Sequence, residues 1–484
     1  MTRSNAVLLS LFVFSGVFLA ILAWAARRTH NAADFLLGSR RAGVWLTALS
    51  YSGNAVTAWM MLAFSAAAFS WGFAALWIWA AVLLGYLLNW FYVAPRLRVL
   101  SIGQGSLTLT QVLSADAGDR MQRLVVRSAS CLIVGLLLIQ IGAQLNAVGL
   151  TLATNFELDA GTCVISLTLA LTLSTLVGGF WNASMSDALQ VVMILAIGLL
   201  LPIPALIAAG GPEQLWHGFV VLGEETTDLF GGRSDVVAIA FAVGVFGLGL
   251  ALTGQPQVLN RFMAARDEST LRAARWIALL YVAIQLAMVM ICGWCAKVLY
   301  TGLEQPEQAL FALAYRLLPP SLATFIAIAI VTAVLSNMGS QLLVAASSLT
   351  ADLKHSASPL SLPWLRVAVA GFAIAAAGFA LFAPANFLEH TFFSLTALGA
   401  AFGPLVLVRL SGKRIRPGST LGAMWAGFIL TTLFHLLPDS PGDFLERVLP
   451  YVAALGIALS GGERRRNPDR ADRAQETVHD RVPI

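Results

Sequence analysis

The sequence predicts an all-α integral membrane protein with about thirteen transmembrane helices. Hydrophobic residues make up 58% of the 484 residues, and charged residues make up only 11%. A soluble domain carries about 25% charged residues, so this composition cannot cover a surface that faces water. The chain instead contains many uncharged runs of about twenty residues, the length that a helix needs to cross the hydrocarbon core.

The first apolar run, 6–26, has two interpretations. Arg3 precedes it and small residues end it, as in a cleaved signal peptide. Arg27 and Arg28 follow directly, which favours a retained helix whose C-terminal end faces the cytoplasm. We therefore expect this run to be the first transmembrane helix.

The other apolar runs are spaced along the chain as transmembrane spans would be. With the first run they give about thirteen spans. They lie near 45–70, 73–93, 126–152, 161–179, 187–209, 235–257, 272–300, 320–350, 363–383, 388–410, 418–437 and 445–461.

The loops between these spans alternate in charge. Every second loop is rich in arginine or lysine, for example around Arg40, Arg98 and Arg266, whereas the intervening loops are mostly acidic, as at Glu224 and Asp443. Positive loops face the cytoplasm. This pattern predicts a multi-pass protein of the inner (plasma) membrane with its N-terminus outside and its C-terminus in the cytoplasm.

Other function classes lack support in the sequence. The four cysteines lie inside apolar runs, which disfavours a disulfide framework and favours buried packing. A redox pair remains the alternative for Cys292 and Cys295 because of their CxxC spacing. The net charge of +5 is spread over the loops, so no nucleic-acid partner is expected. Paired carboxylates and histidine clusters are missing from the spans, so we expect no enzyme and no cofactor.

Small, turn-forming residues interrupt two spans. The first interruption is SYSGN at 50–54, and the second extends from GLG at 247–249 to TGQP at 253–256. Breaks in a membrane helix free backbone groups that lipid cannot satisfy, so they must face protein, water or a ligand. The alternative is that these glycines only let helices pack closely.

The spacing of the two breaks suggests an inverted repeat. They would open two five-helix units, spans two to six and spans seven to eleven. We expect four regions: an extra N-terminal helix and cytoplasmic loop (1–42), the five-plus-five core (43–410), two C-terminal helices (411–462) and a disordered cytoplasmic tail (463–484).

Several sequence blocks resemble the sodium/solute symporter family, and sodium/proline permeases most of all. They occur in order between residues 34 and 410. They include DFLLG (34–38), LTALS (46–50), SDALQ (186–190), GQPQVLNRFMAA (254–265), QLLVAASSLTADL (341–353) and ALGAAFGP (397–404). The resemblance implies a secondary transporter that imports a small polar solute with sodium. A transporter-like sensor and a proton-coupled or sodium-independent transporter remain as alternatives.

The resemblance also implies a sodium site between span two and span nine. Backbone carbonyls would come from Gly53, Val56 and Ala333, and side-chain oxygens from Ser336 and Asn337. Neutral oxygen ligands suit a hard cation that must later be released. Asn337 stands where proline permeases have a second hydroxyl residue, and it could instead hydrogen-bond a neighbouring helix.

The residues implied in substrate binding depart from the proline permeases. Ala55 replaces an aspartate, and Gln140, Leu248 and Leu252 replace aromatic residues. Leu248 and Leu252 could instead be ordinary core residues, and Gln140 could form a hydrogen bond between helices. The solute could therefore be proline, another amino acid, an organic acid or another polar metabolite. The full implied set is Ala55, Trp59, Gln140, Leu248, Leu252 and Gln255.

Two charged residues are implied in gating and in the cation path. Asp187 is expected at the cytoplasmic mouth of span six, with solvation at the surface as the alternative. Arg261 could close an inner gate by pairing with an acid, or it could be an ordinary loop arginine. The expected partners are the solute, sodium and the lipid bilayer. A monomer is one possible state, and the sequence does not determine the oligomeric state.

Overall fold

A computed structural model of the chain describes residues 16–464, apart from 57, 116, 157, 301, 304, 353–360, 384–386 and 439. The start of the first apolar run and the tail from 465 lie outside the described residues. The side chain of Trp59, one of the implied substrate residues, also lies outside them.

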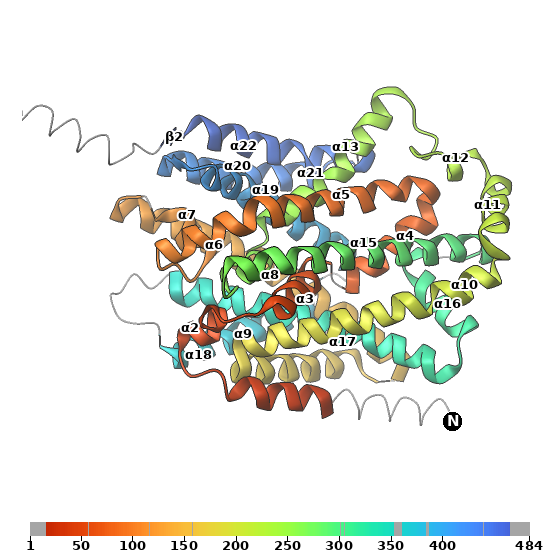
Figure 1. Cartoon of the computed structure of the whole chain (residues 1–484), viewed down its shortest axis with the longest axis horizontal. Helices are drawn as coiled ribbons and strands as arrows, with labels where there is room; N and C mark the ends of the chain where they lie inside the picture. The colour runs from red at the N-terminus through yellow and green to blue at the C-terminus, as the bar shows by residue number, and fades with distance from the viewer. Residues whose placement is uncertain are drawn as a thin grey trace, which may run out of the picture.

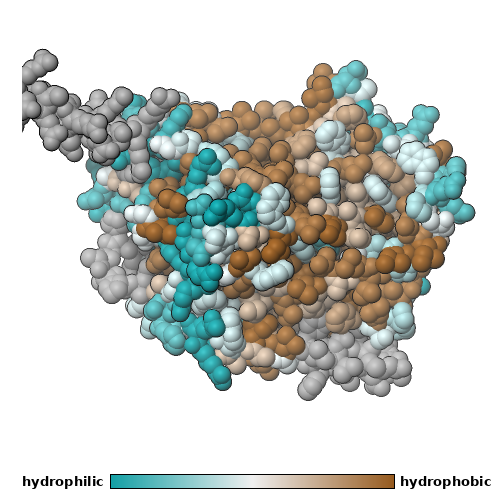
Figure 2. All heavy atoms as spheres, in the orientation of Figure 1, coloured by the Kyte–Doolittle hydropathy of each residue, from teal (hydrophilic) through white to brown (hydrophobic). Residues whose placement is uncertain are grey.

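The described chain is almost entirely helical, as the sequence predicts (Figure 1). Eight of its helical runs are long and apolar enough to cross a membrane. In the space-filling view, hydrophobic residues form a broad band across the middle of the molecule, and hydrophilic residues gather towards its two ends (Figure 2). This surface suits a molecule whose helices cross a bilayer.

The helices of the N-terminal half follow the apolar runs. An apolar helix at Gly16–Ala26 comes first. It is followed by α2 (Ala32–Leu37), η1 (Gly38–Arg40), α3 (Val44–Ala55), α4 (Ala58–Trp71), η2 (Gly72–Ala75), α5 (Leu76–Leu87), the π-helical η3 (Leu88–Val93), α6 (Ala94–Gly103), α7 (Leu109–Ser114), α8 (Asp119–Phe156), α9 (Ala160–Leu200), α10 (Pro202–Ala208), α11 (Gly211–Leu222) and α12 (Glu224–Thr227).

The C-terminal half begins with a short interrupted helix and ends with a small hairpin. Its elements are α13 (Asp235–Ala251), η4 (Leu252–Gly254), α14 (Pro256–Met263), α15 (Glu268–Leu299), η5 (Pro306–Gln308), α16 (Ala309–Leu317), α17 (Pro320–Ser347), the π-helical η6 (Ser348–Asp352), α18 (Leu362–Phe382), α19 (Phe387–Leu410), β1 (Lys413–Ile415), α20 (Pro417–His435), η7 (Pro441–Asp443), α21 (Phe444–Arg447), α22 (Leu449–Ser460) and β2 (Gly462–Arg464). The strands β1 and β2 pair antiparallel.

The apolar runs 161–179 and 187–209 are not separated by a loop. They are joined in α9, which has a sharp kink at Gly179 (φ 48°, ψ −133°). A side chain at this position would lie 2.6 Å from the ring of Phe35, because α2 packs directly against the kink. The positive φ and the close packing both require glycine here.

The loops that the charge pattern assigns to one side of the membrane lie together in the structure. Arg40 donates hydrogen bonds to the carbonyl oxygens of Ser106 (2.7 Å) and Met263 (2.9 Å). Arg98 donates to the carbonyl oxygens of Ala265 (3.0 Å) and Arg266 (2.6 Å). Three loops that are far apart in the sequence therefore meet at one end of the molecule.

Glycines in α13 let this helix approach α5 at backbone distance. A β-carbon on Gly249 would lie 2.0 Å from the carbonyl oxygen of Ala81, and one on Gly85 would lie 2.4 Å from the carbonyl oxygen of Gly249. A β-carbon on Gly247 would lie 2.6 Å from the β-carbon of Arg447. These α13 glycines are helical, so the close-packing interpretation is the correct one for GLG at 247–249.

We expect Gly249→Ala to destabilise the protein by about 1–3 kcal/mol, because the added methyl group has no room beside α5. Thermal unfolding of the purified protein in detergent measures the effect. Gly371→Ala on α18 is the matched control, since nothing lies within 4 Å of the added β-carbon. Equal melting temperatures for the two variants would contradict the close contact between α13 and α5.

Candidate functional site

The first helix break lies between α3 and α4, slightly later than the sequence predicted. Residues 50–54 remain helical, and the prediction of a break there is wrong. The helix ends at Ala55, and Val56 leaves helical geometry (φ −119°, ψ 85°). Asn54 supports the last turn, because its side-chain nitrogen donates to the Ser50 carbonyl oxygen at 2.9 Å.

The second break lies within the predicted segment. After α13 the chain forms the short η4, and Gln255 is extended (φ −83°, ψ 107°) before Pro256 begins α14. Proline disfavours helical geometry in the residue before it and has no N–H for a helical hydrogen bond. The sequence therefore stops the helix at this point by local chemistry.

Amide side chains bind carbonyl oxygens of this second break and of the neighbouring helix α19. The Gln255 amide donates to the carbonyl oxygens of Ala251 (3.1 Å) and Leu395 (2.8 Å). Asn89 donates to the carbonyl oxygen of Leu252 at 3.1 Å. The break is thus fixed between η3 and α19 by amide side chains, which replace the hydrogen bonds that lipid cannot supply.

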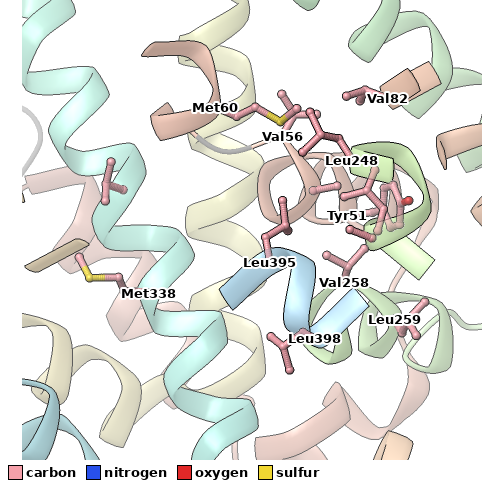
Figure 3. Close-up of a cluster of buried hydrophobic side chains, with 14 of the residues drawn as sticks. Tyr51, Val56, Met60, Val82, Leu248, Val258, Leu259, Met338, Leu395 and Leu398 are labelled. Atoms are coloured by element: carbon pink, nitrogen blue, oxygen red, sulfur yellow. The ribbon is translucent and has the colours of Figure 1, made fainter. Parts of the chain in front are cut away.

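A small cavity of about 20 Å³ lies between the two breaks. Its lining includes five of the implied substrate residues and one implied sodium ligand. These are Ala55, Gln140, Leu248, Leu252, Gln255 and Asn337, joined by Asn54, Met60, Gln257, Gln341 and Leu395. Met60, Leu248 and Leu395 are the lining residues that Figure 3 labels, and there they extend from different helices. The structure therefore brings together residues from α3, α8, α13 and α17.

The implied sodium ligands divide into two neighbouring groups. Asn337 lines the cavity, whereas the Ser336 hydroxyl donates to a carboxylate oxygen of Asp187 at 2.7 Å. A β-carbon on Gly53 would lie 3.0 Å from the Asp187 carbonyl oxygen, so α3 packs against α9 here. The other two, Val56 and Ala333, are buried.

Asp187 is the centre of a buried polar cluster. Its carboxylate is paired with Arg261 at 3.0 Å, and both side chains are almost completely buried (0% and 3% exposed). Ser340 donates to the carboxylate at 3.0 Å, and Asn54 donates to it at 2.5 Å. The alternatives of a surface-solvated Asp187 and of a loop Arg261 are therefore wrong.

This Asp187 cluster joins four helices. It connects α9 to α3 through Asn54, to α14 through Arg261 and to α17 through Ser336 and Ser340. Arg261 also donates to Ser184 at 2.6 Å. A buried charge pair with this many hydrogen bonds is costly to disrupt from one side only.

We expect Arg261→Met to destabilise the protein by about 3–5 kcal/mol, because it leaves the Asp187 carboxylate buried without a counter-charge. The double variant Asp187→Asn with Arg261→Met should regain much of this loss. Thermal unfolding of the two single variants and the double variant gives the coupling. Strictly additive effects would show that the two side chains do not stabilise each other.

A second cavity lies between the central cavity and the end of the molecule opposite the arginine-rich loops. It has a volume of about 240 Å³ and includes Glu307, Asp443 and Arg447 in its lining. Met60 and Leu248 line both this cavity and the central cavity. The two spaces are therefore separated by only a few apolar side chains.

An apolar cavity of about 220 Å³ lies on the other side of Ser336. The N-terminal helix, α9 and α17 line it, with Phe18, Met193 and Leu335 among the contributing residues. It contains none of the implied substrate residues, so the central cavity is the better candidate for the solute.

The sequence alone did not identify several residues that line the cavity or belong to the Asp187 cluster. Asn54, Gln257, Ser340 and Gln341 all lie within or beside the blocks that carry the family resemblance. A polar residue inside an apolar membrane helix is costly and is usually functional. That signal was present, but helical periodicity alone could not show which of these side chains face a common space.

Comparison with known proteins shows which family the chain matches. The family model described as the sodium:solute symporter family matches residues 35–429. The high-affinity proline transporter PutP of Bacillus subtilis is 30% identical over 442 residues, which cover 89% of this chain and 92% of that protein. The sodium/proline symporter of Escherichia coli is 28% identical and covers 88% of each.

A solved structure has the same fold. A Na⁺-coupled sialic acid symporter, described in a substrate-bound outward-open state, superimposes with a TM-score of 0.79 at 16% sequence identity. The match covers 96% of this chain and 99% of that chain. At this low identity the likeness concerns the fold alone.

Proposed function

Because the chain belongs to the sodium:solute symporter family, we propose that it imports a small polar solute together with sodium by alternating access. The observation that carries this proposal is the central cavity between two helix breaks, next to the buried Asp187 cluster. Transport requires a ligand to bind two states with different affinity, and no covalent chemistry. The matched relatives are likewise named as transporters and not as enzymes.

The proposed sodium site uses the oxygens at the end of α3 and on α17. The carbonyl oxygens of Gly53, Val56 and Ala333 would bind the ion together with Ser336. Support comes from the end of α3 at Ala55, since the last carbonyls of a helix have no partner within it. Asn337 would bind the ion or the solute through its amide oxygen, because it lines the cavity.

Asp187 and Arg261 would form the inner gate and the start of the cation path. Ser336 hydrogen-bonds Asp187 and is also a proposed sodium ligand, so binding of the ion changes the hydrogen bonds of the gate. On the opposite side, Met60 and Leu248 would form the outer barrier, since they line both the central cavity and the wider one. Trp59 stays part of the proposed substrate site by resemblance alone.

The proposed architecture has thirteen transmembrane helices with the N-terminus outside. The core, 43–410, would consist of two five-helix units in inverted repeat, each opened by one of the broken helices. The N-terminal region (1–42), the two later helices (411–462) and the cytoplasmic tail (463–484) would lie outside the repeat. Support comes from the positions of the two breaks and from the meeting of the arginine-rich loops at one end.

We expect Ser336→Ala to weaken sodium-stimulated uptake by about tenfold in apparent sodium affinity, because one oxygen ligand is lost. Uptake of solute into membrane vesicles, over a range of sodium concentrations, measures this effect. Ser347→Ala is the control: it lies on the same helix, and its hydroxyl donates only to the Val344 carbonyl oxygen within that helix. An unchanged sodium dependence in Ser336→Ala would remove Ser336 from the site.

We expect Ala55→Asp to increase the apparent sodium affinity, because it adds a carboxylate to the central cavity beside the end of α3. The same vesicle measurement, repeated with a proton gradient in place of sodium, separates the two coupling ions. If the sodium dependence does not change, Ala55 lies outside the reach of the ion.

A further inference from the structure

The wall of the central cavity is rich in carboxamides. Asn54, Gln140, Gln257, Asn337 and Gln341 line it, together with Gln255. All six are at least 95% buried. Among the described residues that line the cavity, none is charged.

Most of these amides have atoms without a hydrogen-bond partner in the described part of the chain. The oxygens of Asn54, Gln140, Gln257 and Gln341 have none, and Asn337 has none for either amide atom. A buried polar group without a partner costs about 1–3 kcal/mol. Such a concentration marks this small cavity as a place where a bound solute or ordered water can supply the missing partners.

The neighbours of two amides determine which atom each offers to the cavity. The Asn54 nitrogen donates to the Ser50 carbonyl oxygen and to Asp187, so its free atom is the oxygen. The Gln255 nitrogen donates to two carbonyl oxygens, so its oxygen accepts from the Gln257 nitrogen at 3.2 Å. The free atom of Gln257 is then also its oxygen. The cavity therefore contains two fixed hydrogen-bond acceptors.

These fixed acceptors restrict the charge of the solute. A carboxylate group facing the oxygens of Asn54 and Gln257 would be repelled by both, and among the unpartnered amide atoms of the wall only the Asn337 nitrogen is a donor. A positively charged solute would be repelled by the sodium ion in the same site and by the Arg261 guanidinium. Arg261 lies close to the cavity, because it pairs with Asp187, and Asp187 accepts a hydrogen bond from the cavity residue Asn54. An uncharged solute with several N–H or O–H groups meets neither penalty.

We infer that the carboxamide wall of the central cavity selects a small uncharged solute with at least two hydrogen-bond donors, of the ureide or primary amide class. This inference rests on the proposed transport function and narrows its substrate. The apolar side chains of Met60, Leu252 and Leu395 would pack against the faces of such a planar molecule. Because the cavity is only about 20 Å³ as it stands, these flexible side chains must move to admit it.

The test is thermal stabilisation of the purified full-length protein, with and without sodium. The probes are hydantoin and malonamide as uncharged donors, proline as a zwitterion and succinate as an anion. We expect sodium-dependent stabilisation by at least one of the two amide probes, at concentrations about tenfold lower than proline or succinate requires. Stronger stabilisation by proline or succinate, or no stabilisation by either amide probe, would overturn the inference.

Variants connect the result to the cavity wall. Gln257→Met keeps the shape of the side chain but removes the fixed acceptor, and should weaken binding of the amide probe about tenfold. Gln285→Met is the matched control, because Gln285 is a fully buried glutamine with an unpartnered oxygen on α15 and does not line the cavity. Equal losses in both variants would show a general effect on folding and would contradict the inference.

The same measurements separate this inference from the proposed function. Sodium-dependent stabilisation or uptake of proline alone would leave a sodium-coupled transporter standing and would overturn only the substrate class. A protein whose stability and uptake do not respond to sodium with any of the four probes would count against the proposed coupling itself.

Discussion

The architecture depends on one constraint: a polypeptide that breaks its helix inside a membrane must find partners for the freed backbone groups. Here amide side chains provide them. Gln255 and Asn89 bind the carbonyl oxygens around the second break, and Gln255 also joins it to α19. These hydrogen bonds attach the segment from α13 to α14 to the neighbouring helices. An interrupted helix is costly in lipid, but here its freed backbone groups and their amide partners form a polar space inside an apolar bundle.

The packing of the helices also depends on the buried Asp187 cluster. A carboxylate and a guanidinium at 3.0 Å, almost fully buried, are stabilised by the hydroxyls and the amide that hydrogen-bond to them. The cluster joins four helices, and it shares Asn54 with the central cavity. In the proposed mechanism, this shared residue would be a physical route by which an ion near Ser336 and a solute in the cavity influence each other.

Glycines let the broken segment pack closely against neighbouring helices. At Gly249 and Gly85 the backbones of α13 and α5 come into contact, and at Gly254 a β-carbon would lie 2.7 Å from the Leu398 carbonyl oxygen. Helices in lipid gain little from hydrophobic burial, so close packing of small residues contributes much of their association. Close backbone contacts and amide hydrogen bonds thus both attach the broken segment to α19 and to the α5–η3 helix.

The sequence by itself determined the membrane class, the positions of most apolar helices and the family, because hydropathy, charge and local blocks are properties of neighbouring residues. It also located the second break, since Pro256 disfavours helical geometry in the residue before it whatever surrounds it. Only the tertiary structure decided that residues 50–54 stay helical, that Arg261 pairs with Asp187, and that Gln257 and Gln341 face one cavity. Those facts depend on which helix faces meet, and residues more than seventy positions apart carry no local signal of their contact.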